Sequence, residues 1–510
     1  MLNGKRFISG SPDQGELLPT YPSDLVPEDH PARVLKEMVD FLDLSVIYQK
    51  YGREGGKTYH PKTLINILFY AYSTGNRQSR KISKACRENL VYMFLSGGLF
   101  PDFRTISDFR NNNFDILEDI FKQIVKLCHK LGMISFGNIS FDGTKIKANA
   151  SDKRVAQKDK LEEVMKKIDK EIEQMLKDAE ALDVEDNARF GAENSGDELP
   201  ERIKKSKARK KEIQSLVDEM KQQERNTLSL TDKNCRFMKS KGRLQLSYNG
   251  QCATENQVIL AYDINNQEAD KDQLVTMVDK VEAIASSLLN KKEYPLENSK
   301  GLFDAGYDSG KNLSHLINRK IDAYVANQME SVYEKDKNGT DTTRSYSKEK
   351  FIYHADDDYY ECPAGEKLFP AGKRTDTMKT YIRHCVLYKC QSCHRCINQS
   401  VCTKSKSGFR SVKRYLEYDP IREMIDKKLA TKEGKKIFQQ RSMDVEPVFG
   451  QIKTNVLCQG SLLVRGNKKV KGEFGLICIV HNIKKVINYL KLNKIRRNLI
   501  DFKESAFQTA

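Results

Sequence analysis

The N-terminal part of the chain carries apolar residues at helical spacing. They recur three or four positions apart in residues 64–72 and again in residues 116–127, where they form one stripe along a helix. Pro61 suits the first turn of the earlier helix, and Gly132 suits the end of the later one. The pattern predicts an all-α N-terminal domain over residues 1–132 that begins with a polar arm.

After this region the pattern changes to short strands separated by turns and helices. Residues 134–142 favour a strand that ends at Asp142, where a glycine follows. Residues 299–303 favour a second strand that ends just before Asp304, and again a glycine lies close behind. Two carboxylates are therefore expected at the ends of two strands.

Between these strands, residues 244–265 contain two further strands. They are joined either around Asn249-Gly250 or at the polar residues 253–257. Helices and strands then alternate, which is typical of a sheet with flanking helices. We expect an α/β core formed first by residues 133–157 and 226–350.

Residues 158–225 are heavily charged, and their apolar residues lie near heptad spacing on either side of a loop with Gly and Pro. This pattern predicts two antiparallel helices in a hairpin. This segment contains no candidate catalytic or metal-binding motif, so we interpret the hairpin as a structural insertion or an oligomer contact.

The net positive charge of the chain indicates which classes of binding partner to expect. The formal net charge is +17, and residues 403–510 hold 24 Lys and Arg against 10 Asp and Glu. Such an excess favours nucleic acid or an anionic membrane surface, although a solvated surface would look similar. The longest uncharged apolar stretch, residues 474–480, is too short to span a bilayer, so we expect no membrane partner and a cytoplasmic protein.

The two aspartates suggest a divalent metal site, because hard oxygen ligands suit Mg²⁺ and Mn²⁺. Two-metal phosphodiester cleavage needs a third carboxylate from another element. Glu446 is a candidate, since it lies seven residues before Lys453 and could share one face of a helix with it. The plainer interpretation of Asp142 and Asp304 is that each forms a turn or caps a helix.

Cysteines cluster in one segment, with Cys390, Cys393, Cys396 and Cys402 within thirteen residues and Cys362 upstream. In a reduced protein this spacing indicates thiolate coordination, most simply of a structural Zn²⁺. The spacing leaves open which four cysteines bind. An iron–sulfur cluster and reduced core thiols are the alternatives.

Four motifs carry a family resemblance: DGTKIKANAS around Asp142, YNGQ at residues 248–251, DAGYDS around Asp304 and VEPVFGQIK around Glu446. They resemble, in order, the DDE transposases of bacterial insertion sequences, in particular the subgroup with a Y-R-E-K signature. The matches run from about residue 59 to residue 490.

This resemblance implies a ribonuclease-H-like core with Asp142 on its first strand, Asp304 on a later strand and Glu446 on a helix behind the sheet. It further implies Mg²⁺ or Mn²⁺ at these carboxylates, with Lys453 and Arg441 as phosphate clamps.

The sequence departs from the signature near its third acidic residue. Phe438 stands where the signature has Tyr, and Arg441 lies five residues before Glu446 rather than four. Pro447 also disfavours an uninterrupted helix through this segment.

For the cysteines, the resemblance implies ligation by Cys362, Cys393, Cys396 and Cys402, with Cys390 as a substitute, in an insertion over residues 351–412. Residues 413–510 would then supply the helix with Glu446 and basic C-terminal helices. The implied partners are double-stranded DNA, at element ends and target, and a second copy of the chain on that DNA, close to the nucleoid.

The predicted activity is therefore metal-dependent DNA cleavage followed by joining of the freed 3′-hydroxyl to target DNA. A structure-specific nuclease would need the same carboxylates. A non-catalytic DNA-binding protein descended from a transposase is the third alternative.

Overall fold

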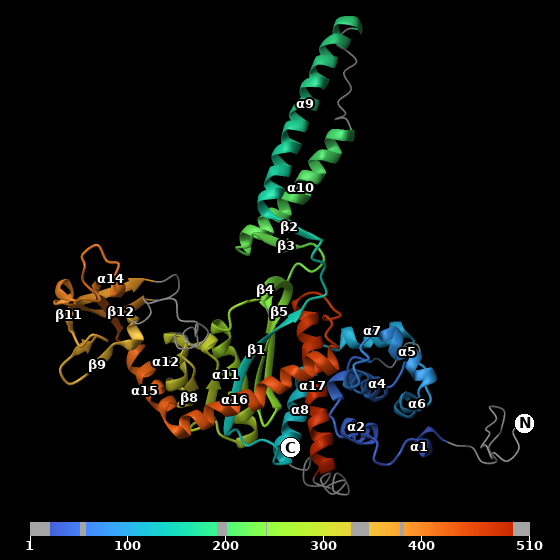
Figure 1. Cartoon of the computed structure of the whole chain (residues 1–510). Coiled ribbons are helices and arrows are strands. Elements are labelled where there is room, and N and C mark those ends of the chain that lie inside the picture. The colour runs from blue at the N-terminus through green and yellow to red at the C-terminus, as the bar shows by residue number, and fades with distance from the viewer. Residues whose placement is uncertain are drawn as a thin grey trace, which may run out of the picture.

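The computed structural model describes residues 21–51, 58–190, 201–240, 242–327, 346–377 and 382–492 (Figure 1). The predicted N-terminal arm lies largely outside these residues, as do the end of the basic C-terminal region, residues 493–510, and most of the segment from 328 to 350. None of the helices within the described part combines the length and hydropathy that a bilayer crossing requires.

Only helices precede the first strand in the described residues. They are α1 (Pro22–Leu25), α2 (Pro31–Asp40), α3 (Ser45–Tyr48), α4 (Pro61–Ser73), α5 (Ser79–Glu88), α6 (Leu90–Ser96), α7 (Phe103–Asn112) and α8 (Leu117–Lys130). Helices α2 and α4 both start at a His-Pro pair. The His30 and His60 side chains accept hydrogen bonds from backbone N–H groups of the first turn, while the proline has no N–H to satisfy.

A central sheet of six strands follows. It contains β1 (Asn138–Lys147), β4 (Arg236–Ser240), β5 (Arg243–Glu255), β6 (Val258–Asn265), β7 (Lys300–Phe303) and β8 (Asp322–Val325). Strand β5 pairs antiparallel with β4, β6 and β1, and β1, β7 and β8 follow in parallel. This mixed α/β arrangement is consistent with the ribonuclease-H-like core that the resemblance implies.

Strand β1 is longer than the sequence predicted. Asp142 does not end it, because β1 keeps pairing with β5 as far as Lys147, and Asp142 lies opposite Cys252. Only the parallel pairing of β1 with β7 ends next to Asp142, because its last pair is Phe141 with Phe303.

The turn between β5 and β6 uses the second of the two predicted positions. Asn256 and Gln257 form it, both with positive φ (52° and 62°), whereas Asn249 and Gly250 lie inside β5. Two successive left-handed residues give the tight connection that antiparallel strands favour.

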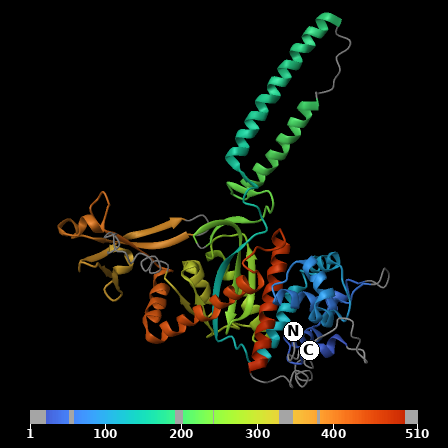
Figure 2. The same ribbon diagram turned by 45° about the vertical axis from the view of Figure 1, so that its right-hand side comes forward.

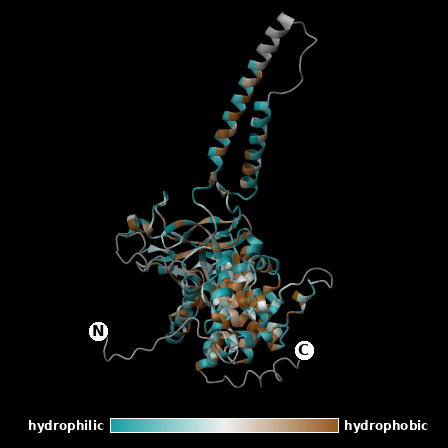
Figure 3. Ribbon diagram, turned by 90° about the vertical axis from the view of Figure 1, so that its right-hand side faces the viewer, coloured by the Kyte–Doolittle hydropathy of each residue, from teal (hydrophilic) through white to brown (hydrophobic). Residues whose placement is uncertain are grey.

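Long helices pack on the sheet. They are α11 (Leu274–Leu289), α12 (Gly310–Asn318), α15 (Asp419–Ala430), α16 (Lys432–Gln451) and α17 (Asn467–Leu492). Helix α17 contacts β6, α8 and α4, so the N-terminal helices and the sheet share one hydrophobic cluster. Figure 3 shows the apolar residues concentrated in this body of the molecule.

Two insertions stand apart from this body (Figures 1 and 2). Helices α9 (Lys158–Phe190) and α10 (Glu201–Gln222) lie side by side and project away from the sheet, and β2 (Val155–Gln157) pairs with β3 (Thr227–Ser229) at their base. An apolar cluster between the helices includes Ile203 and Val217.

The second insertion is a five-stranded antiparallel sheet with its own small hydrophobic cluster. Its strands are β9 (Ile352–His354), β10 (Tyr359–Glu361), β11 (Lys367–Thr377), β12 (Ile382–Cys390) and β13 (Ser411–Tyr415), and the short helix α14 (Gln399–Cys402) lies between the last two in sequence.

Helix α16 runs unbroken through Pro447, contrary to the expectation from sequence. Proline cannot donate to the carbonyl four residues earlier, which belongs to Met443. That carbonyl instead accepts a hydrogen bond from Nε2 of Gln257 at 3.3 Å, and Asp444 accepts from the backbone N–H of Gln257. The β5–β6 turn thus stabilises the helix where proline weakens it.

A buried ion pair joins the N-terminal helices to α17. Arg77, after α4, lies 3.1 Å from Glu473, and their side chains are 8% and 0% exposed. Glu473 also accepts the backbone N–H groups of Leu463 and Val464, while Arg77 donates to the carbonyls of Leu457 and Ser461. Both charges are therefore compensated without water.

We expect Glu473→Gln to lower the free energy of unfolding by about 3–5 kcal/mol, because it leaves the Arg77 charge buried without its counterion. Urea denaturation of the purified protein measures this. Glu88→Gln is the matched control, since its pair with Lys84 is exposed, and it should change stability by less than about 0.5 kcal/mol. Equal effects of the two variants would contradict the interpretation.

His481 of α17 is buried against the β5–β6 turn, and its Nε2 lies 2.9 Å from the carbonyl oxygen of Gln257. Burial lowers the pKa of His481 to about 4, against a usual value of 6.5. The folded protein therefore resists protonation that the unfolded chain accepts. Its contribution to stability is complete above pH 6.5 and decreases as the pH falls toward 4, by about 3 kcal/mol at most.

His481→Gln keeps a donor but does not titrate, so its unfolding free energy should fall less than that of the wild type between pH 7 and 4.5. Denaturation curves at matched pH values give the difference. Parallel curves for the two proteins would show that His481 does not contribute.

Candidate active site

Asp142 and Asp304 are brought side by side by the register of β1 and β7. Phe141 pairs with Phe303, and their rings stack with centroids 4.5 Å apart. Asp142 follows Phe141 on β1, and Asp304 is the first residue after β7. Because the two strands are parallel, the two carboxylates lie at the same level of the sheet. The sequence placed both residues at a strand end, and the structure brings them to one edge of the parallel pairing.

The electrostatics of Asp142 reflect this crowding. Burial raises the pKa of Asp142 to about 6, and the carboxylates of Asp304 and Asp270 add to that effect. The guanidinium of Arg441 opposes it, with Nη1 3.1 Å from Oδ2 of Asp142. The raised pKa shows that the negative charge on Asp142 is unfavourable in this environment. A bound cation would stabilise the ionised carboxylate.

Asp304 is exposed and lies at the start of a short 3₁₀ turn, Ala305–Tyr307. Its Oδ1 accepts the backbone N–H of Ala305 at 2.6 Å, so the side chain is fixed by the turn that follows β7.

Helix α16 brings two cations to β1. Arg441 pairs with Asp142, and Lys453, in the π-helical segment Ile452–Val456 after α16, donates to the hydroxyl of Thr144 at 2.5 Å. Asp142 and Thr144 are two residues apart on β1, so they lie on the same face of the sheet. The structure thus assembles Arg441, Lys453 and Asp142 from distant parts of the chain.

Glu446 is exposed on α16 and, among the described residues, makes no hydrogen bond or ion pair with Asp142 or Asp304. It precedes Lys453 by seven residues, nearly two helical turns, so both leave the same flank of the helix. Glu446 therefore lies on the flank from which Lys453 reaches β1.

The donor chemistry of Asp142 and Asp304 fits a hard divalent cation, because two carboxylates lie next to each other at the end of a parallel strand pair. No group of three or more His, Cys, Asp or Glu that could hold a metal ion is found within the described ranges.

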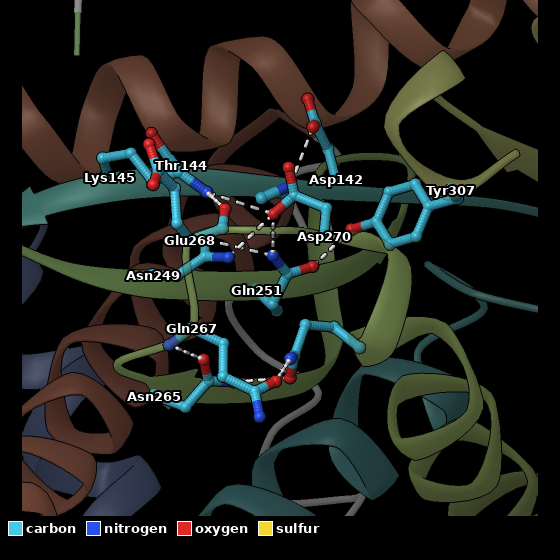
Figure 4. Close-up of polar contacts among 12 residues, drawn as sticks. Asp142, Thr144, Lys145, Asn249, Gln251, Asn265, Gln267, Glu268, Asp270 and Tyr307 are labelled. Atoms are coloured by element: carbon cyan, nitrogen blue, oxygen red, sulfur yellow. Dashed lines mark hydrogen bonds and ion pairs between the residues drawn. The ribbon is translucent and has the colours of Figure 1, made fainter. Parts of the chain in front are cut away.

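Sequence reasoning missed Asp270. Figure 4 shows this side chain among polar groups of β1 and β5, with Lys145, Asn249 and Gln251 directed toward it. Two of these residues, Asn249 and Gln251, belong to the YNGQ motif, and their alternation along a strand was the one available signal. Asp270 itself follows a polar loop, which gives it no distinguishing pattern.

Asp308, four residues after Asp304, does not cap the helix that follows it. Ser309 caps α12 by accepting the backbone N–H of Asn312, whereas Asp308 is buried. Its carboxylate accepts from the hydroxyl of Tyr418 and pairs with Arg422 at 3.4 Å. Asp308 therefore ties the loop after Asp304 to helix α15.

All five predicted cysteines line one small cavity of about 20 Å³: Cys362, Cys390, Cys393, Cys396 and Cys402. Backbone N–H groups of Glu366 and Arg410 donate to the sulfurs of Cys362 and Cys393, both at 3.3 Å. Such donors stabilise thiolates, so the chemistry of the set fits a soft metal ion. Within the described part of the chain, the cysteines do not form a group of three or more that could hold a metal ion.

Two parts of the chain match families of known proteins. Residues 361–487 match a family described as transposase DDE domain, and residues 21–112 match one described as transposase domain (DUF772). The first range contains Glu446 with the cysteine cluster, and the second covers α1 to α7. No curated protein matches the chain significantly.

Proposed function

We propose that this chain, which its two domain matches indicate to be a DDE transposase of an insertion sequence, cuts DNA at the ends of its element and joins the freed 3′-hydroxyl to target DNA. The observation that supports this most is the adjacency of Asp142 and Asp304, two residues far apart in sequence, beneath a helix that carries Glu446. Such carboxylates serve phosphodiester chemistry without a protein nucleophile.

Asp142 and Asp304 would hold the catalytic cations, and Glu446 would complete the set. When bound, Mg²⁺ or Mn²⁺ ions lower the pKa of an attacking water and stabilise the leaving oxygen. The chain's own contribution is to fix the carboxylates: the β1–β7 register sets their spacing, and the 3₁₀ turn holds Asp304.

Arg441 and Lys453 have a second role in this proposal. Both reach the active face of β1, where the phosphate of a DNA strand would lie. Arg441 pairs with Asp142. With Asp142 engaged by a cation, the Arg441 guanidinium would be available to bind a phosphate. Such contacts position DNA without reading its sequence.

The helices of residues 21–112 would bind the element ends, in keeping with their match to a transposase domain. A second copy of the chain is expected on the DNA, because joining requires two ends to be held together.

We expect Asp142→Asn, Asp304→Asn and Glu446→Gln each to keep DNA binding but to reduce cleavage and joining by about 100-fold or more, beyond the usual effect of losing an outer-shell partner. The assay uses terminal DNA cut to expose a 3′-hydroxyl, a supercoiled plasmid and Mg²⁺ or Mn²⁺. A gel resolves nicked and joined products, and filter binding measures affinity.

Glu433→Gln, an exposed change on the same helix as Glu446, and Asp272→Asn are the controls and should act as the wild type. Wild-type rates in Glu446→Gln would remove Glu446 from the site. Nicking by the wild type without joining would make the protein a nuclease, and tight binding with neither activity would make it a non-catalytic DNA-binding protein.

We also propose that the cysteine cluster binds a structural Zn²⁺ that stabilises the sheet β9 to β13. The supporting observation is the convergence of the cysteines on one cavity, with backbone donors on two sulfurs. The choice of Cys362, Cys393, Cys396 and Cys402, with Cys390 as substitute, follows the resemblance.

Protein purified without chelator should contain about one zinc ion per chain by elemental analysis. Cys393→Ser and Cys396→Ser should lose this metal and melt at lower temperature, because binding energy is folding energy in such sites. Cys458→Ser, an exposed cysteine outside the cluster, should keep it. Iron with sulfide would indicate an iron–sulfur cluster instead, and the absence of both metals would exclude a metal site.

A further inference from the structure

Asp270 is a carboxylate whose position is fixed from two strands. Its Oδ1 accepts hydrogen bonds from Nδ2 of Asn249 at 2.8 Å and Nε2 of Gln251 at 2.7 Å, and Nζ of Lys145 lies 3.3 Å away (Figure 4). Three donors on one oxygen, one of them charged, hold a side chain far more firmly than a single surface contact.

This carboxylate lies against the backbone just after Asp142. A Cβ at Gly143 would come 2.6 Å from Oδ1 of Asp270 and 2.1 Å from Nε2 of Gln251. No side chain fits there, so the absence of one at Gly143 allows Asp270 and Gln251 to pack directly on β1.

Asp270 also lies near the chain after Asp304. A Cβ at Gly306 would be 3.6 Å from Oδ2 of Asp270, which is ordinary contact distance. Asp270 therefore lies between the backbone that follows one catalytic carboxylate and the backbone that follows the other.

The network continues to the Asp304 turn through Gln251. The hydroxyl of Tyr307 donates to Oε1 of Gln251, and Tyr307 is buried three residues after Asp304. Burial, with the nearby carboxylates, raises the pKa of Tyr307 well above its usual value, so the hydroxyl keeps the proton that it donates. Asp270, Gln251 and Tyr307 thus link β1, β5 and the turn that carries Asp304.

We propose that Asp270 is a positioning residue of the active site: through Gln251 and Tyr307 it fixes the distance between Asp142 and Asp304, and so the affinity of the pair for divalent cations. The inference rests on the proposed function. It assigns Asp270 no contact with the DNA.

Asp270→Asn keeps the volume and an acceptor oxygen but removes the charge that holds Lys145 and strengthens the two amide contacts. We expect Mn²⁺ binding to the full-length protein without DNA, followed by electron paramagnetic resonance, to weaken about 10- to 100-fold. The Mg²⁺ concentration for half-maximal cleavage should rise in parallel, while DNA affinity and melting temperature stay near wild-type values.

Three further variants serve as comparisons for Asp270→Asn. Asp272→Asn makes the same change two residues away at an exposed position and should leave Mn²⁺ affinity unchanged. Asp142→Asn should abolish the Mn²⁺ signal, which assigns that signal to the catalytic carboxylates. Tyr307→Phe breaks only the far end of the network, and we expect a smaller but measurable loss of Mn²⁺ affinity, of up to about 10-fold.

Wild-type Mn²⁺ affinity in Asp270→Asn would overturn the inference and leave the proposed function intact. If Asp270→Asn fails to fold, Tyr307→Phe decides in the same way. A wild-type protein that binds no Mn²⁺ at Asp142 would overturn both.

Discussion

The register between β1 and β7 is the constraint on which the candidate active site depends. The stacked rings of Phe141 and Phe303 fill the face of the sheet opposite the Asp142 side chain, so burial of these rings fixes the pairing. A slip of one residue would turn each side chain of the moved strand to the other face. The hydrophobic core therefore determines where the carboxylates lie, although neither carboxylate is part of it.

A second constraint is the β5–β6 turn, which holds two helices at once. Gln257 donates its backbone N–H to Asp444 and its side-chain amide to the Met443 carbonyl of α16, and its own carbonyl accepts from His481 of α17. Gln257 fixes α16 at Met443 and Asp444. Arg441 lies before this point in the sequence and Lys453 lies after it, and both side chains reach β1. The turn thus positions the basic side of the site without belonging to it.

The insertions leave the central sheet intact. The helical hairpin follows the end of β1, and the cysteine-lined sheet lies between β8 and α15, so neither interrupts a strand pairing. The second insertion is tied to the core at one end of α15, where Arg414 of β13 pairs with Glu423 and Arg422 pairs with Asp308. That link runs to the residue four positions after Asp304. Because the Arg422–Asp308 pair is buried, it connects the insertion firmly to the loop that follows Asp304.

Local patterns determined much of this protein. Helical spacing, strand-like alternation and cysteine spacing predicted the helices before β1, the hairpin helices, and most strands, because each depends on residues near one another in sequence. The sequence also singled out Asp142 and Asp304. Tertiary structure alone decided that β1 continues past Asp142, that α16 passes through Pro447, and that Asp308 bonds to α15. Each of these outcomes depends on a partner about a hundred residues away or more. The partner is β5 for the length of β1, Gln257 for α16, and Arg422 for Asp308. Asp270 shows most clearly what sequence patterns cannot predict. Its surroundings are two strands and a turn that only folding brings together, and no residue near it in sequence indicates them.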